Sequence, residues 1–163
     1  MKAIMISIKP KWVAKILNGE KTIEIRKTKP KCDLPIDVYI YCTKDKKSGL
    51  HYSKEYGAFN DLVGGMEHYS TIGDGCGKVV AKFTLNKIRT SDMTNCLQGS
   101  CLSYDEVNEY TKGKKFYGWH IDNLVIFDEP KELRQYHLVN DKLGVKLMGL
   151  TKAPQNYCYV EVE

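Results

Sequence analysis

The chain has 163 residues and a mass of 18.6 kDa, with 42% hydrophobic and 28% charged residues, a composition that excludes wholesale disorder. This length favours one core over two small ones, so we expect residues 1–163 to form a single domain. No apolar run approaches the ~18 residues of a membrane-spanning helix, and the first one is too short for a secretory signal peptide. These features predict a cytoplasmic protein with no membrane partner.

The net charge of +5 is unevenly distributed along the chain. Residues 1–47 hold 12 Lys and Arg against 5 Asp and Glu, whereas residues 48–163 hold 13 against 15. The whole basic excess therefore lies in the first third, which indicates an anionic partner such as nucleic acid or a nucleotide near the N-terminal elements. A Lys-rich surface that only aids solubility is the alternative interpretation.

The cysteines fit a reducing compartment, because no C-x-x-C pair occurs among them. Cys96 and Cys101 are the nearest pair in sequence, and their separation is not the usual spacing of zinc ligands. We expect thiols, with no metal site and no cofactor. The six residues are Cys32, Cys42, Cys76, Cys96, Cys101 and Cys158.

The first elements follow clear patterns. Residues 3–8 predict a strand, and Pro10 suits the first turn of a helix whose apolar residues recur at helical spacing as far as Leu17. Gly19 is a natural stop for this helix. Residues 21–26 then predict a strand that places Ile23 and Ile25 on one face and Thr22, Glu24 and Arg26 on the other.

Alternation over residues 36–42 predicts a half-buried strand. Residues 43–76 form a long, irregular insert rich in glycine and lysine, in which residues 56–62 are expected to form a short helix. A segment of this length without regular structure is typically functional or partly disordered.

The rest of the chain predicts further strands and one helix. Residues 77–85 are expected to form a strand with Val79, Ala81, Phe83 and Leu85 on one face. Ser103 and Glu106 match a capping box, which starts a helix that ends before residue 113. Strands are expected at 118–127, as one or as two joined at 122–123, and at 156–163, with a turn at 130–133. The pattern predicts a mixed α/β, mostly β fold, a small barrel with flanking short helices.

The most informative stretch is residues 19–26, where a helix ends and a strand begins with charged residues on one face. Glu24 and Arg26 are two residues apart and share that face, and Lys21 lies at the turn before it. Arginine can grip a phosphate or a base edge with two hydrogen bonds, and lysine can act as a point charge. The stretch predicts a small polar cleft, unless it is an ordinary exposed face of ion pairs.

The pattern Gly19-x-Lys21-x-x-Glu24-x-Arg26 resembles the G-x-K-x-x-E-x-R signature of ASCH domains in the PUA-like superfamily. The helix from Pro10 precedes the motif as it does in that family. The segments at 35–42, 77–81, 117–120 and 153–160 resemble later parts of ASCH proteins common in bacterial and prophage genomes. The resemblance implies a PUA-like β-barrel with the motif lining a cleft, and a role in binding RNA.

One branch of small ASCH proteins hydrolyses N4-acetylcytidine with a Lys, a Thr and a Glu. The Lys of that branch matches Lys21, but its Thr falls where this sequence has Glu24. The resemblance therefore leaves enzymatic activity open, with Lys21 and Glu24 as the catalytic pair if the protein is a nucleoside amidohydrolase.

Three functions follow from the sequence: binding of RNA or of a nucleotide or nucleoside, hydrolysis of an acylated nucleoside, and a protein-interaction module based on the insert. Binding needs only positive potential, a shaped pocket and stacking surfaces. Trp12, Tyr39 and Tyr41 lie near the basic residues in sequence and are candidates for stacking, although most of the 11 tyrosines are expected to pack in the barrel. The oligomeric state is not predicted. The expected ligand-binding residues are Lys9, Lys11, Lys21, Glu24, Arg26 and Lys27.

Overall fold

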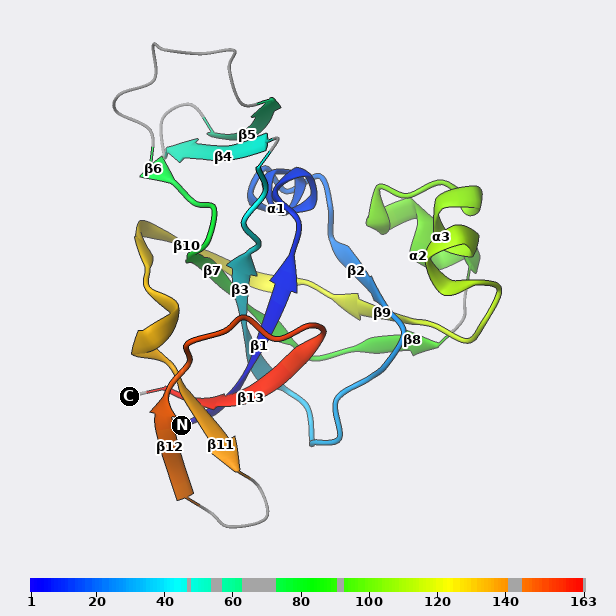
Figure 1. Ribbon diagram of the computed structural model, residues 1–163. Helices are drawn as coiled ribbons and strands as arrows, with labels where there is room; N and C mark the ends of the chain where they lie inside the picture. The colour runs from blue at the N-terminus through cyan, green and yellow to red at the C-terminus, as the bar shows by residue number, and fades with distance from the viewer. Residues whose placement is uncertain (47, 54–56, 63–72, 91–92, 141–144, 163) are drawn as a thin grey trace.

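The computed structural model describes residues 1–46, 48–53, 57–62, 73–90, 93–140 and 145–162. Its centre is a seven-stranded sheet in the order β10-β7-β3-β1-β13-β11-β12, in which β1 and β3 are parallel and the other neighbours antiparallel (Figure 1). Its strands are β1 (Lys2–Ile8), β3 (Ile36–Cys42), β7 (Val79–Leu85), β10 (Asp122–Lys131), β11 (His137–Asn140), β12 (Val145–Gly149) and β13 (Tyr157–Glu161).

Two three-stranded sheets accompany the central one. The first has the order β2-β9-β8 and lies beside the two helices α2 and α3, and the second has the order β5-β4-β6 and lies next to helix α1 (Figure 1). The elements are α1 (Pro10–Leu17), β2 (Ile23–Arg26), β4 (Ser48–Ser53), β5 (Gly57–Leu62), β6 (Gly73–Asp74), β8 (Ile88–Thr90), α2 (Met93–Ser100), α3 (Tyr104–Thr111), β9 (Tyr117–His120) and the 3₁₀ turn η1 (Leu133–Gln135).

The prediction of a mixed, mostly β fold with short helices is confirmed. The barrel is not: within the described ranges the hydrogen-bonded sheets stay open, with β10 and β12 at the edges of the central sheet. No helix in these ranges is long and apolar enough to cross a membrane.

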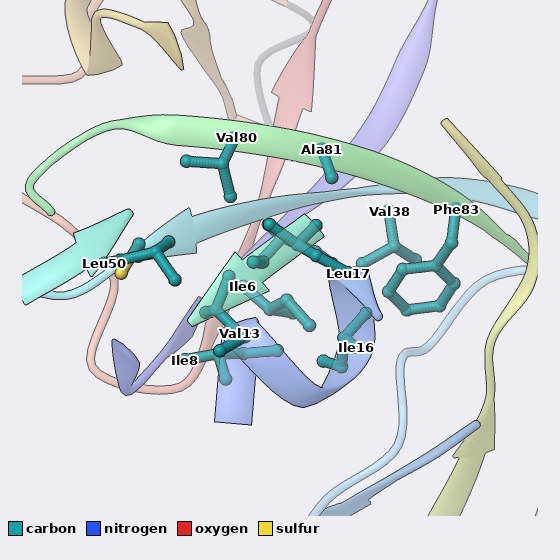
Figure 2. Close-up of a cluster of buried hydrophobic side chains, with 14 of the residues drawn as sticks. Ile6, Ile8, Val13, Ile16, Leu17, Val38, Leu50, Val80, Ala81 and Phe83 are labelled. Atoms are coloured by element: carbon teal, nitrogen blue, oxygen red, sulfur yellow. The ribbon is translucent and has the colours of Figure 1, made fainter. Parts of the chain in front are cut away.

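Helix α1 packs its apolar side into the main core, as its periodicity predicted. Figure 2 shows Val13, Ile16 and Leu17 on the helix directed toward side chains of the central sheet such as Val38 and Phe83. Pro10 occupies the start of the helix, and Gly19 follows its end with φ at +75°, a conformation that glycine adopts without a Cβ penalty.

Strand β3 is buried on both faces, so the expectation of a half-buried strand is wrong. Val38, Ile40 and Cys42 join the core under α1, while Tyr39 and Tyr41 join a second core on the opposite face of the sheet. The alternation is real, but both of its sides are covered, as happens for a central strand. The two tyrosines are therefore packing residues and do not offer stacking surfaces to a ligand.

The insert at residues 43–76 is the part of the chain whose structure differs most from the prediction, because it contains regular strands. Residues 57–62 form strand β5 and no helix, paired in an antiparallel hairpin with β4. Leu50 is fully buried and Tyr52 is 6% exposed, and both belong to the core that α1 covers. The side chain of Asn18, just after α1, accepts from Ala58 N at 2.8 Å and donates to Ala58 O at 2.5 Å, which fastens the hairpin to the helix. Residues 54–56 and 63–72, to which the prediction for the insert also applied, lie outside the described residues.

Strand β7 carries a bulge that the alternation did not reveal. Ala81 pairs with Ile40, but Val79 pairs with Tyr41, so Val80 is an extra residue on β7. Val79 consequently packs in the second core, on the face opposite Ala81, and its predicted place beside Ala81 is wrong.

The C-terminal half is more strand-rich than predicted. Residues 118–127 divide into β9 and β10, as in the second of the two expected arrangements, but the break falls at Ile121 and not at 122–123. Asn123, inside β10, adopts φ at +49°. Pro130 continues β10 instead of starting a turn, and a register shift between Ile126 and Lys131 accommodates it. The closing strand is confirmed as β13, whereas α2, β8, β11 and β12 were not predicted.

Candidate functional site

A cleft of about 720 Å³ lies where the end of β1, the start of α1, strand β2, helix α3 and residues 153–155 meet. Four of the predicted ligand-binding residues line it: Lys9, Lys21, Glu24 and Arg26. The sequence motif therefore contributes its charged side chains to one cavity.

Glu24 lies between two cations at the wall of the cleft. Its Oε2 atom is 3.4 Å from Lys21 Nζ, and its Oε1 atom is 3.7 Å from Arg26 Nη1. Lys21 is 2% exposed, and Glu24 and Arg26 are each 7% exposed. The ion pairs exist, but the alternative of an ordinary solvated face is wrong because all three side chains are buried.

Strand β2 is covered on both faces, which explains this burial. Ile23 and Ile25 pack against residues of α2, α3 and the segment before β9, including Cys96 and Val107. The opposite face carries Glu24 and Arg26 into the cleft. A charged side chain in such a position needs a partner, and the three residues supply one another.

Lys21 is held in place by helix α2. Its ammonium group donates a hydrogen bond to the carbonyl oxygen of Ser100, at the C-terminal end of α2, at 2.6 Å. The same Nζ lies 5.3 Å from the centroid of the Trp12 ring. The Lys21 ammonium group therefore contacts a carbonyl oxygen, a carboxylate and an aromatic face.

Arg26 joins two distant parts of the chain. Its Nη2 atom donates to Ser7 O at 3.2 Å and to Asn156 O at 2.7 Å. Ser7 also donates from its hydroxyl to Pro154 O at 2.7 Å. These bonds fix the end of β1 against the segment that forms another wall of the cleft, so Arg26 is a positioning residue as well as a wall residue.

Two predicted residues lie at the rim and do not line the cleft. Lys11 Nζ is 4.5 Å from the centroid of Trp12, and Lys27 Nζ is 4.6 Å from the centroid of Tyr110. Both rings line the cleft. The lysines therefore place positive charge beside its aromatic walls.

Helix α3 contributes side chains that sequence reasoning missed. Glu106, Glu109 and Tyr110 line the same cleft as the motif, although they lie far along the chain from residues 19–26. The described lining residues include three acidic and three basic side chains, so the cleft is balanced in charge and does not share the basic excess of the N-terminal third. The capping box predicted the start of α3 but did not indicate that side chains of this helix would line the cleft.

The capping box itself is confirmed. Ser103 Oγ accepts from Glu106 N at 3.2 Å, and the Glu106 carboxylate accepts from Ser103 N at 2.8 Å. These hydrogen bonds lower the pKa of Glu106 because they favour the ionised carboxylate.

Replacing Ser103 with alanine removes one half of the box. We expect a loss of about 1 kcal/mol in the free energy of unfolding, measured by urea titration, because a backbone N–H at the helix start loses its acceptor. Asp105→Ala, in the same helical turn but outside the box, serves as the control. Equal losses in the two variants would contradict a specific capping role.

His120 lies on β9 outside the cleft. Its Nε2 atom accepts from Arg89 Nε at 3.1 Å. Burial lowers the pKa of His120, and the positive charges of Arg89 and Lys87 lower it further. A hydrogen bond to Arg89 and a position outside the cleft lining are typical of a structural histidine.

Because the neutral form of His120 is favoured in the folded state, its contribution to stability is present above the ordinary pKa of about 6.5 and is lost as the pH falls below it. We expect the loss of stability between about pH 7.5 and about pH 5.5 to be smaller in His120→Gln than in the wild type, measured by urea unfolding. Identical losses in both proteins would show that His120 does not carry this dependence.

The thiols do not build a metal site in the described ranges. No group of three or more His, Cys, Asp or Glu side chains there lies close enough to hold a metal ion. Cys96 is buried beneath β2, whereas Cys101 is partly exposed and its thiol donates to Glu20 O at 3.4 Å.

The fold is that of ASCH domain proteins, as the sequence motif predicted. The chain is similar to the solved structure of an ASCH protein from Zymomonas mobilis, with a TM-score of 0.61 and 18% identity, over 98% of this chain and 87% of that one. A single-substitution variant of the same protein gives a TM-score of 0.62 and 17% identity, over 99% of this chain and 91% of that one. No family model matches the sequence, and no curated protein matches it. At this level of identity the likeness concerns the fold, and the prophage type stays a prediction.

Proposed function

We propose that the cleft binds a nucleobase, as part of a nucleoside, a nucleotide or single-stranded RNA. The observation that carries the proposal is the buried set Lys21, Glu24 and Arg26 in the wall of a cleft of about 720 Å³. This volume lies in the range of small-molecule sites.

The chemistry of the walls suits a flat, polar heterocycle. A carboxylate accepts hydrogen bonds from the amino group of cytosine, and an ammonium donates to ring nitrogen or carbonyl acceptors. Glu24 and Lys21 offer these groups side by side, and Trp12 and Tyr110 offer aromatic surface on which a base can stack.

The balanced charge of the cleft suggests that the cleft and its rim bind different parts of the ligand. Glu106 and Glu109 disfavour a phosphate deep in the cleft, whereas the exposed Lys9 in its lining, and Lys11 and Lys27 beside its aromatic walls, offer positive charge to a phosphate. In this proposal the base enters the cleft and any phosphate remains at the rim. Lys21 and Arg26 then form hydrogen bonds with the base or position it, and the lysines around the cleft contact the phosphates of the RNA backbone.

Trp12, Lys9 and Lys11 provide the test, because none of them is a member of the buried ion pairs that Glu24 forms with Lys21 and Arg26. Cytidine, cytidine monophosphate and a short single-stranded RNA are titrated by calorimetry against wild type, Trp12→Ala and Lys9→Ala/Lys11→Ala. We expect Trp12→Ala to weaken all three ligands by tenfold or more, about the effect of removing one stacking partner. The double lysine variant should weaken only the phosphate-bearing ligands and lower the salt slope for RNA by about 1 to 1.5.

Lys131→Ala, on the edge strand β10, is the matched control for removing an exposed lysine. Absence of binding by all three ligands at millimolar concentration, or equal effects of Trp12→Ala and Lys131→Ala, would overturn the proposal.

Hydrolysis of an acylated nucleoside is the second candidate, favoured by the contact of 3.4 Å between Glu24 and Lys21 at the cleft wall. Glu24 would accept a proton from the attacking water, and Lys21 would stabilise the negative charge that develops on the acyl oxygen. Thr22 is exposed and outside the cleft lining, so it does not replace the threonine of the hydrolase branch. Release of cytidine from N4-acetylcytidine by wild type but not by a folded Glu24→Gln variant would establish the activity, and no release at high protein concentration would leave binding alone.

The third candidate, a protein-interaction module, was based on the insert. Its described strands contribute Leu50 and Tyr52 to the core, so this part of the insert has a structural role.

A further inference from the structure

Two cysteines far apart in sequence meet where the insert begins and ends. Cys42 is the last residue of β3, and Cys76 lies in the turn between β6 and β7. Their Sγ atoms are 3.9 Å apart. Residues 43–75 form the chain segment between them.

The main chain holds the two thiols in this position. Cys42 N donates to Lys78 O at 2.9 Å, and Gly77 N donates to Cys42 O at 2.8 Å. A disulfide has a sulfur separation of about 2.0 Å, so the two sulfurs need to approach by about 2 Å, within reach of side-chain rotation. The backbone pairing around Cys42 can therefore stay in place when the bond forms.

The two thiols differ in access to solvent. Cys42 is fully buried, whereas Cys76 is partly exposed. An external disulfide can therefore reach Cys76 first. Cys42 is then the residue placed to resolve the resulting adduct, because it is adjacent and shielded.

We propose that Cys42 and Cys76 are a redox-modification site that forms an intramolecular disulfide by exchange with a low-molecular-weight disulfide such as oxidised glutathione. The Cys76 thiolate attacks one sulfur of the oxidant, which forms a mixed disulfide and releases one thiol. The Cys42 thiolate then attacks the Cys76 sulfur and releases the second thiol. The two cysteines lose two electrons and two protons in total, and the oxidant is reduced to two thiols.

The bond closes a covalent loop around residues 43–75. It links the segment that contains the sheet β5-β4-β6 covalently to the end of β3. Cys42 directly precedes Thr43, which lines the cleft. Closing such a loop stabilises the folded state relative to the unfolded chain, and the oxidised protein is expected to melt several degrees higher than the reduced one.

The test is equilibration of the folded protein in glutathione redox buffers, followed by alkylation and peptide mapping. We expect a Cys42–Cys76 bridge in the wild type, a persistent glutathione adduct on Cys76 in Cys42→Ser, and a bridge at wild-type level in Cys101→Ser, which removes another partly exposed thiol. Oxidation should raise the melting temperature of the wild type and of Cys101→Ser, but not that of Cys76→Ser.

Two results would overturn the inference. One is a wild type that remains fully reduced at a potential that oxidises an ordinary dithiol. The other is a bridge or adduct that forms on other cysteines while Cys76 stays reduced. The wild-type map decides the matter even if Cys42→Ser fails to fold, because it needs no variant.

Discussion

Replacing Glu24 with alanine is expected to lower the free energy of unfolding by about 3–5 kcal/mol. The carboxylate is the shared partner of Lys21 and Arg26, at 3.4 and 3.7 Å, and both cations are buried. Without it, two positive charges would face each other in a site that water reaches poorly. Urea or guanidinium unfolding followed by circular dichroism measures the loss.

The chain offers a matched control for this substitution. Glu20 pairs with Lys15 at 2.9 Å, a shorter distance, but the two side chains are 51% and 35% exposed. Exposed pairs contribute only about 0–1 kcal/mol, so Glu20→Ala should change stability little. Similar losses in Glu20→Ala and Glu24→Ala would refute the argument that burial, and not the ion pair as such, makes Glu24 important.

Replacing Leu50 with alanine is expected to cost about 2–5 kcal/mol of the free energy of unfolding, the range of a fully buried leucine. Leu50 is 0% exposed and lies in the core with α1 and the central sheet (Figure 2). Leu50 belongs to strand β4, in a segment that the sequence analysis predicted to be irregular. Thermal or urea unfolding checks it.

Leu34, at 36% exposure, provides the control for the loss of the same side-chain atoms at the surface. Leu34→Ala should change stability by about 0.5 kcal/mol or less. If Leu50→Ala were as mild as Leu34→Ala, the sheet β5-β4-β6 would be an appendage, and the packing of its side chains under α1 would have no energetic weight.

The sequence predicted well those parts of the fold whose signals are local. The strand at 3–8, the helix from Pro10, the stop at Gly19 and the capping box at Ser103 each depend on a few adjacent residues. Their outcomes agree because propensity, capping and hydrophobic periodicity act over one or two turns of chain.

The misses arise from tertiary contacts. Alternation in β3 could not reveal that both of its faces are covered, since that depends on α1 and on the second core. The bulge at Val80 shifts a side chain to the other face, which no local pattern records. In the insert, the glycine-rich composition gave no signal for the hairpin of β4 and β5. This hairpin is stabilised by packing on α1 and by the hydrogen bonds of Asn18 with Ala58.

The candidate site shows the same division. The motif residues Lys21, Glu24 and Arg26 could be found because they share one strand and its turn. Their acceptors Ser100 O and Asn156 O could not, because they come from segments 79 and 130 residues away and use main-chain atoms that carry no sequence signal. The acidic side chains of α3 were missed because they come to the cleft from a segment that is distant in sequence.

The position of β13 between β1 and β11 has a consequence for the order in which the chain matures during synthesis. Strand β1 leaves the ribosome well before β13, with which it pairs in the register Lys2 with Glu161. The carbonyl of Asn156 that Arg26 binds also emerges late. The cleft can close only after residues 153–161 have emerged, so nascent chains hold an unfinished site and contacts between distant residues set the pace of folding.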